Sequence, residues 1–123
     1  MKISDDNAAA FCAGVLEGEA CFDIRKSNAL KRDPNNKAVR IIVEMKDLDV
    51  LEKLRYHFGG TVNPVLCKSK VKDNWSPYYK WLLSSREEIY NCLLAIEPYM
   101  SLRRRLKIEE MIEFIERKTN ENL

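Results

Sequence analysis

The sequence predicts an α+β fold in the order αββαββα(α), with a four-stranded antiparallel sheet and helices on one face. Three observations predict it. Residues 8–16 form a helical run without a polar residue, segments such as 21–25 alternate apolar and polar residues, and Gly59-Gly60 ends the helix that opens a second α-β-β unit. Because sheets twist, the uncovered face is expected to be concave. At 123 residues the chain fits a single domain, 1–123.

The first helix is predicted to begin near residues 4–6, which suit an N-cap, and to end at Gly18. Its nine apolar or small residues leave no solvent face, so it must be buried all round, and it is too short to span a bilayer. Ala10, Gly14 and Gly18 recur every four residues, so a second backbone could approach that face closely. The bulkier side chains are expected to cover the sheet: Phe11, Cys12, Val15 and Leu16.

Residues 21–25 alternate apolar and polar side chains, which predicts a half-buried strand with Phe22 and Ile24 toward the helices. A polar loop, 28–36, leads into a second strand at 39–43. Consecutive apolar residues in that strand leave open which side chains face the core.

The second α-β-β unit begins with a helix after Asp47 that ends at Gly59-Gly60. A third strand is predicted at 61–68, where Pro64 indicates an edge position or a bulge, and a fourth at 78–83. The residues expected to cover or fill the core are Leu48, Leu51, Leu54, Tyr56 and Phe58 in the helix, and Tyr79, Trp81 and Leu83 in the fourth strand.

Two helices complete the predicted fold. A capping box at 85–88 opens the third helix, which runs to Pro98. The last helix is predicted to be an amphipathic surface element. Its apolar residues are Leu106, Ile108, Met111, Ile112 and Ile115.

The net charge of +2 at pH 7 does not by itself indicate a nucleic-acid partner, but its distribution does. Residues 20–42 hold six Lys or Arg against two Asp, and residues 61–86 hold five against one. Because both segments are predicted hairpins, one face of the sheet is predicted to be positive and suited to phosphates. The alternative is that these are ordinary solvated hairpin loops.

The four cysteines, Cys12, Cys21, Cys67 and Cys92, lack the paired spacing of a metal site, and His57 is the only histidine. We therefore expect reduced thiols rather than structural zinc. The sequence shows neither a signal peptide nor a long apolar span. We expect an intracellular protein, in the cytoplasm or in an organelle if organelle-encoded, with no membrane partner.

Residues 12–20 read Cys-Ala-Gly-Val-Leu-Glu-Gly-Glu-Ala, which resembles the LAGLIDADG motif of homing endonucleases. Ala13 and Gly14 are identical to it, Glu17 and Glu19 replace its two acids, and Ala20 replaces its last glycine. The predicted element order is also that of the family. One motif copy implies a homodimer whose motif helices pack through small residues and whose saddle-shaped sheets lie on double-stranded DNA.

The resemblance also implies site residues. Glu19 is the expected ligand of Mg²⁺ or another divalent cation, with the Gly18 carbonyl beside it, since hard cations prefer oxygen ligands. Arg103, shortly after the third helix, is the candidate for stabilising charge on the scissile phosphate. The alternative is that residues 103–105 hold the DNA backbone or cap a solvated turn. The expected dimer interface is Ala10, Ala13, Gly14 and Glu17, with a structural role for Glu17 equally open.

In such enzymes a polar residue late in the second strand often positions water. Here that region contains Met45, which cannot do so. Either Glu44 or Lys46 substitutes for it, or the chain cleaves poorly or not at all.

Strand side chains opposite the core are the candidates for reading base edges, whereas loop lysines are expected to contact phosphate. The candidates for DNA binding are Arg25, Ser27, Arg40, Asn63, Tyr78, Lys80, Lys68 and Lys70.

Two other classes of function stay open. One is a LAGLIDADG-like nucleic-acid binder without nuclease activity, such as an intron splicing maturase or a transcription regulator, which lacks metal-dependent cleavage. The other is a small α+β interaction module, which predicts weak binding to DNA that does not change with salt.

Overall fold

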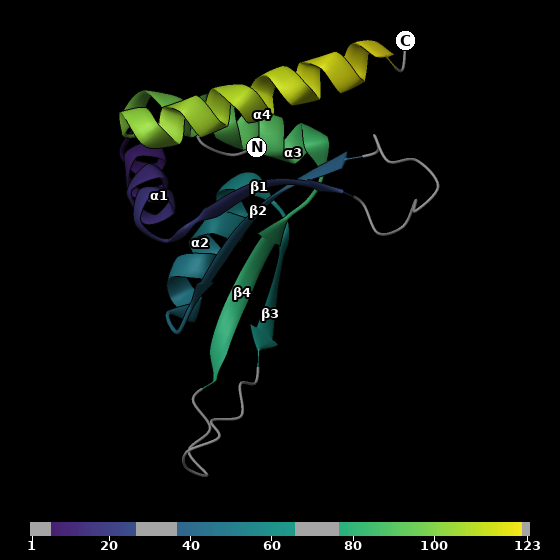
Figure 1. The fold of residues 1–123 in the computed structure, drawn as a ribbon. Coiled ribbons are helices and arrows are strands. Elements are labelled where there is room, and N and C mark those ends of the chain that lie inside the picture. Colours follow the sequence, from purple (N-terminus) through teal and green to yellow (C-terminus); the bar gives the residue numbers. More distant parts are fainter. Residues whose placement is uncertain (1–5, 27–36, 66–76, 122–123) are drawn as a thin grey trace.

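The computed structural model describes residues 6–26, 37–65 and 77–121. Its elements follow the predicted order, with a short 3₁₀ turn before the last helix (Figure 1). They are α1 (Asp6–Glu19), β1 (Cys21–Lys26), β2 (Lys37–Met45), α2 (Leu48–Phe58), β3 (Thr61–Val65), β4 (Tyr78–Leu83), α3 (Arg86–Ile96), η2 (Glu97–Tyr99) and α4 (Leu102–Glu121). None of the described helices combines the length and the apolar character needed to cross a membrane.

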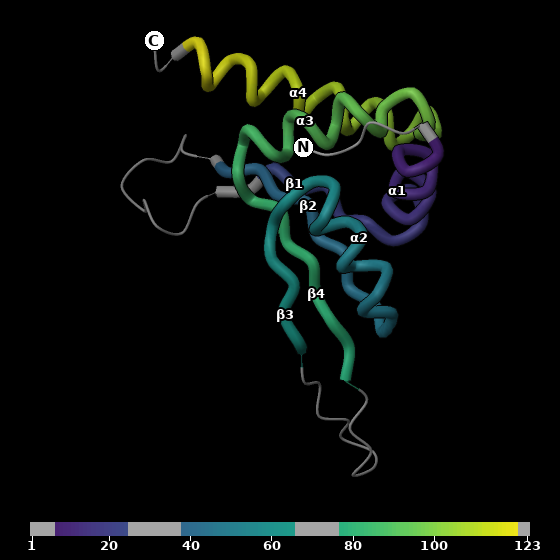
Figure 2. The backbone as a smooth tube through the Cα atoms, turned by 180° about the vertical axis from the view of Figure 1, so that it is seen from behind, coloured from purple at the N-terminus to yellow at the C-terminus, as the bar shows by residue number. Residues whose placement is uncertain are grey.

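The four strands form one antiparallel sheet in the order β1-β2-β4-β3. The strand direction turns strongly between β1 and β4, so the sheet is twisted (Figures 1 and 2). Pro64 lies in β3, which is an edge strand, and this confirms its predicted position. The first hairpin brings Cys21 opposite Ile42, so the end of α1 lies beside the C-terminal half of β2.

One face of the sheet packs against the helices. Phe22, Trp81 and Leu83 are buried as predicted. In β2, alternate residues from Val39 to Val43 are buried in the same core, which settles the phase that the sequence left open. Arg40, Ile42 and Glu44 therefore lie on the other face, the free face of the sheet, with Asp23 and Lys80.

Four predicted core residues are exposed instead. Phe11 in α1 is 44% exposed, Leu48 and Tyr56 in α2 are 38% and 67% exposed, and Leu106 in α4 is 59% exposed. Each is on the outer side of its helix, and Phe114, which the prediction omitted, is buried in α4. In the single chain α1 therefore has an exposed side, and its predicted burial all round stays a prediction about a partnered helix.

The turn between α2 and β3 depends on glycine. Gly59 and Gly60 have φ angles of +93° and +84°, a region that side chains with a Cβ rarely adopt. The indole Nε1 of Trp81 donates a 2.9 Å hydrogen bond to the Gly59 carbonyl. This contact holds the turn before β3 against the C-terminal half of β4.

Candidate active site and nucleic-acid interface

The predicted metal ligand lies at the junction of α1 and β1. Glu19 is the last residue of α1, one position later than the predicted helix end, and its side chain is exposed. Gly18 is exposed as well, and the Ala20 amide closes the helix by donating to the Leu16 carbonyl at 3.1 Å. The strand that follows carries the chain directly onto the sheet.

This junction is chemically suited to a hard divalent cation. Mg²⁺ keeps several waters and binds proteins through one or two carboxylates, with substrate phosphates completing its shell. Among the described residues no group of three or more His, Cys, Asp or Glu side chains is placed to hold a metal on its own. The exposed carboxylate of Glu19 is one oxygen ligand of the kind that such a cation binds.

The other acid of the motif has a different environment. Glu17 accepts a 2.6 Å hydrogen bond from the backbone amide of Ser101, which immediately precedes α4. Its carboxylate also lies 3.3 Å from Nε of Arg104. Hydrogen bonding to Ser101 lowers the pKa of Glu17 below its ordinary 4.5, and the charges of Arg104 and Arg103 lower it further. Glu17 therefore joins α1 to α4 within one chain.

Two adjacent arginines at the start of α4 have different surroundings. Arg103, the predicted catalytic cation, is exposed, and its positive charge contributes to the lowered pKa of Glu17. The side chain of Arg104 instead packs against the motif residue Glu17 and is only 17% exposed. Its Nη1 donates to the Ala20 carbonyl at 2.7 Å and its guanidinium lies over the ring of Phe22, 5.5 Å from the centroid. The sequence singled out Arg104 only as a member of the run 103–105, without a contact to the motif.

The small-residue face of α1 is open. Ala10, Gly14 and Gly18 are exposed, and a Cβ built on either glycine meets nothing within 4 Å. Ala13 does not share this face, because it is 1% exposed and belongs to the core of its own chain. In the single chain, Ala13 therefore contributes to its own core rather than to the open face.

The free face of the sheet carries polar side chains in cross-strand pairs. Arg40 lies opposite Asp23, with Nε 3.1 Å from the carboxylate. Lys80 in β4 lies between Glu44 on one side and Asn63 on the other. A guanidinium has further N–H donors besides Nε, so the Asp23 contact orients Arg40 without using all of its hydrogen-bonding capacity.

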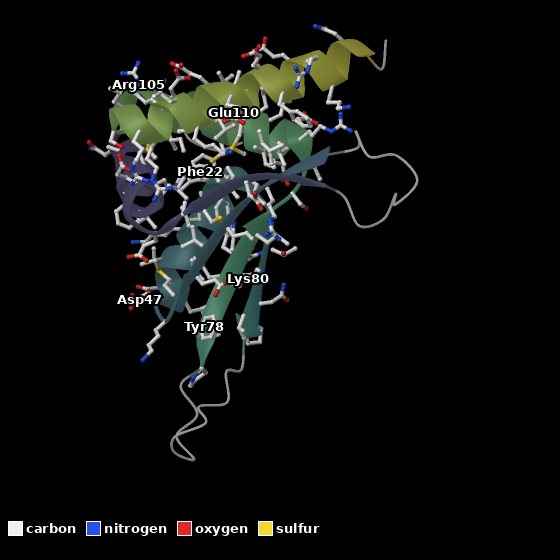
Figure 3. The ribbon with its side chains drawn as sticks, viewed as in Figure 1. Phe22, Asp47, Tyr78, Lys80, Arg105 and Glu110 are labelled. Carbon is white, nitrogen blue, oxygen red and sulfur yellow. The ribbon has the colours of Figure 1, made fainter. Side chains whose placement is uncertain are left out.

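The remaining predicted DNA contacts lie in different parts of the chain. Tyr78 lies along β4 with Lys80, as Figure 3 shows. Arg25 lies in β1, where its backbone is opposite Ala38 of β2. Ser27, Lys68 and Lys70 lie outside the described residues.

The end of β2 carries the residues from which a water-positioning group was expected. Met45 is partly buried and packs against the core, so its side chain faces the helices. Glu44 and Lys46 are exposed, and Glu44 pairs with Lys80 on the free face. Of the two alternatives, Glu44 is therefore placed on the same face as the predicted DNA contacts.

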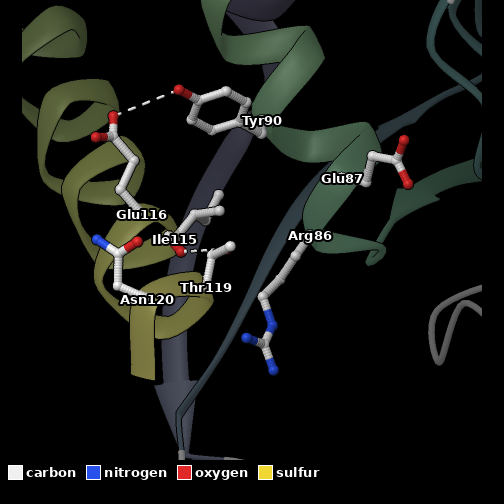
Figure 4. Close-up of a pocket in the computed structure, with 7 residues that line it drawn as sticks. All are labelled: Arg86, Glu87, Tyr90, Ile115, Glu116, Thr119 and Asn120. Carbon is white, nitrogen blue, oxygen red and sulfur yellow. Dashed lines mark hydrogen bonds between the residues drawn. The ribbon is translucent and has the colours of Figure 1, made fainter. Parts of the chain in front are cut away.

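A hollow on the helical side is unrelated to this site. It has a volume of about 750 Å³ and lies between α3 and α4, where the Tyr90 hydroxyl donates to Glu116 at 3.4 Å (Figure 4). Its α4 residues belong to the C-terminal half of that helix, whereas α1 meets the N-terminal end. The chemistry predicted for Glu19 does not involve it.

No protein-family model and no curated protein sequence matches the chain. Solved structures do match its fold. The homing endonuclease I-CvuI in complex with its target superimposes with a TM-score of 0.70 at 15% identity, over 95% of this chain and 71% of that one. The group I intron-encoded homing endonuclease I-CeuI complexed with DNA gives 0.69 at 17% identity, over 94% and 57%. The archaeal intron-encoded I-Vdi141I complexed with DNA gives 0.67 at 19%, over 94% and 70%. The chain therefore has the α+β fold of LAGLIDADG homing endonucleases.

Proposed function

We propose that this protein is a site-specific double-strand DNA endonuclease that works as a homodimer with a divalent cation. One observation carries the proposal: the exposed Glu19 lies where the open small-residue face of α1 meets the sheet. The same junction therefore offers a carboxylate, a surface for a second copy and an adjoining polar face. The fold shared with DNA-bound homing endonucleases supports it.

The proposed DNA contact is the free face of the sheet. Arg40, Asn63 and Lys80 come from three adjacent strands, and each offers donors that can reach base edges in the major groove. With one protomer on each half-site, a two-fold symmetric dimer would occupy a pseudo-palindromic site of about 20 base pairs. The basic character of both hairpin segments predicts an affinity that falls steeply as salt rises.

The proposed dimer contact is the face of Ala10, Gly14 and Gly18. These residues lack bulk, so two α1 helices could approach with their backbones close together. Such packing would bring Glu19 near Glu19 of the second copy at the two-fold axis. Each protomer would then place one carboxylate beside one DNA strand, as double-strand cleavage requires.

The proposed reaction is hydrolysis of a phosphodiester. Glu19 would hold Mg²⁺ or another divalent cation, with the Gly18 carbonyl as a second oxygen, and a cation there supplies charge stabilisation to the phosphate. Arg103 is exposed at the start of α4 and is proposed to stabilise negative charge on the phosphate. Glu44, on the free face, is the proposed residue for orienting water.

A second function is favoured by a specific observation. Met45 turns its thioether toward the core, so a non-cleaving binder results if Glu44 does not orient water. Such a protein would bind nucleic acid as a splicing maturase or a transcription regulator does.

The test is cleavage of a randomised duplex library by the wild-type protein, with Mg²⁺ or with a chelator, followed by sequencing of the cut ends. The proposal expects cuts with Mg²⁺ only, within a sequence that shows two-fold symmetry. Recovery of bound but uncut duplexes would favour the non-cleaving binder. If the protein neither cuts the library nor binds it in a salt-sensitive way, both functions are refuted.

A further inference from the structure

The start of α4 is joined to the end of α1 by a set of contacts that surround Glu19 without including it. Ser101 caps α4, because its carbonyl accepts the Arg105 amide at 2.8 Å and its Oγ accepts the Arg104 amide at 3.5 Å. In a capping box, an acid three residues after the cap reaches back to the amide of the cap residue. That position is Arg104 here, and the acid is supplied by Glu17 of α1 instead, 84 residues away in sequence.

Arg104 in α4 makes further contacts with the residues on either side of Glu19 in the sequence. Its Nε lies 3.3 Å from Glu17, as an ion pair without hydrogen-bond geometry, and its Nη1 donates to the Ala20 carbonyl at 2.7 Å. Its guanidinium also rests on Phe22, the second residue of β1. One side chain therefore contacts residues before and after Glu19.

We propose that Arg104 is a positioning residue that fixes the direction of the Glu19 carboxylate; this rests on the proposed function. Two positions on a helix differ by a rotation of about 200°, so holding Glu17 against α4 directs Glu19 to the opposite side of α1. The bond to the Ala20 carbonyl holds the backbone immediately after Glu19. With both neighbours held, Glu19 has a defined place for a cation without making any contact to Arg104.

Arg104 has a natural matched control one residue away. Arg105 belongs to the same turn and carries the same charge, but it is exposed and points away from α1 and the sheet (Figure 3). Arg105→Gln thus removes the same charge from the same helix end without touching the motif. Arg104→Lys keeps the charge and most of the stem but cannot reproduce the planar fork that reaches both Glu17 and Ala20.

The test uses the full chain and a duplex selected from the randomised library. At saturating DNA, Arg104→Gln should lower the single-turnover cleavage rate roughly 100-fold and raise the Mg²⁺ concentration needed for half the maximal rate. Arg104→Lys should show the same two changes to a smaller extent, with a melting temperature near that of the wild type. At saturating DNA, Arg105→Gln should leave the Mg²⁺ concentration needed for half the maximal rate unchanged. A purely structural role would change the melting temperature but not the Mg²⁺ requirement, and that result would overturn the proposal.

A second measurement does not depend on cleavage. Hydrogen exchange of the peptide covering residues 17–22 should accelerate in Arg104→Gln and Arg104→Lys, and not in Arg105→Gln. Unchanged exchange in both Arg104 variants would overturn the positioning role. If the wild type does not cleave, the proposed nuclease function fails, and this exchange measurement still decides whether Arg104 holds the motif.

Discussion

Replacing Gly14 with alanine should weaken the dimer while making the isolated protomer more stable. Gly14 lies inside α1 and is exposed, and an added Cβ meets nothing within 4 Å in the single chain. Alanine is favoured over glycine within a helix by about 1 kcal/mol, so the protomer should gain roughly that amount. Between two closely packed α1 helices, however, each added methyl group has to displace the partner's backbone.

The size of the loss follows from the symmetry. Overpacking costs roughly 1–3 kcal/mol at each site, and a two-fold axis applies the substitution twice, which gives about 2–6 kcal/mol for the dimer. Since each 1.4 kcal/mol is tenfold, the dissociation constant should rise at least roughly 20-fold. Gly14→Leu, which adds more bulk, should abolish the dimer.

Sedimentation velocity over a concentration series measures the dissociation constant, and thermal unfolding at the lowest concentration measures the protomer. Glu109→Ala, an exposed substitution on α4, is the control that changes helix propensity away from α1. An unchanged dissociation constant in Gly14→Ala would refute the packing of α1 against α1, whatever happens to the melting temperature.

Three further outcomes are expected. Gly60→Ala should cost about 1–3 kcal/mol of unfolding free energy in chemical denaturation, because its φ is +84° and the new Cβ would lie 2.5 Å from the Leu82 carbonyl oxygen; a neutral effect would contradict the turn geometry. Because the pKa of Glu17 is lowered in the folded state, its carboxylate stabilises the fold above about pH 4.5, and this effect is lost as pH falls through the folded pKa. Glu17→Gln should therefore lower the melting temperature at pH 7, and the two melting temperatures should converge in acid. A difference in melting temperature that does not change with pH would argue against the ion pair. Burial raises the pKa of Cys12 to about 11, so mass spectrometry after iodoacetamide treatment at pH 8 should find the exposed Cys21 modified before Cys12. The reverse order would be inconsistent with the packing of α1.

Alternation and turn signals were sufficient to predict the sheet. Trp81 and Leu83 alternate with polar residues and are buried together, and Pro64 could only lie at an edge or a bulge. The phase of β2 could not be predicted, because three apolar residues in a row fit either face. Pairing with β1 decides it, since Asp23 opposite Arg40 fixes the register.

Helix faces were harder to predict than strand faces. Phe11 and Leu106 are apolar and were assigned to the core, but which side of a helix faces inward depends on neighbours that are distant in sequence. The same reason explains the arginines of α4. Adjacent helical residues point about 100° apart. The family resemblance pointed to Arg103 as the residue near the cleavage centre, whereas only the contacts of Arg104 with Glu17 and Ala20 show that Arg104 is turned toward the motif.

The most direct test of the central claim compares the wild type with Glu19→Gln on the duplex recovered from the library. The substitution keeps the size of the side chain but removes the negative charge that a divalent cation needs. We expect equal DNA affinity in the absence of metal and no Mg²⁺-dependent cleavage by the variant, with Glu109→Gln cleaving as the wild type does. Cleavage by Glu19→Gln at the wild-type rate would show that the reaction does not use this carboxylate, and would contradict the account.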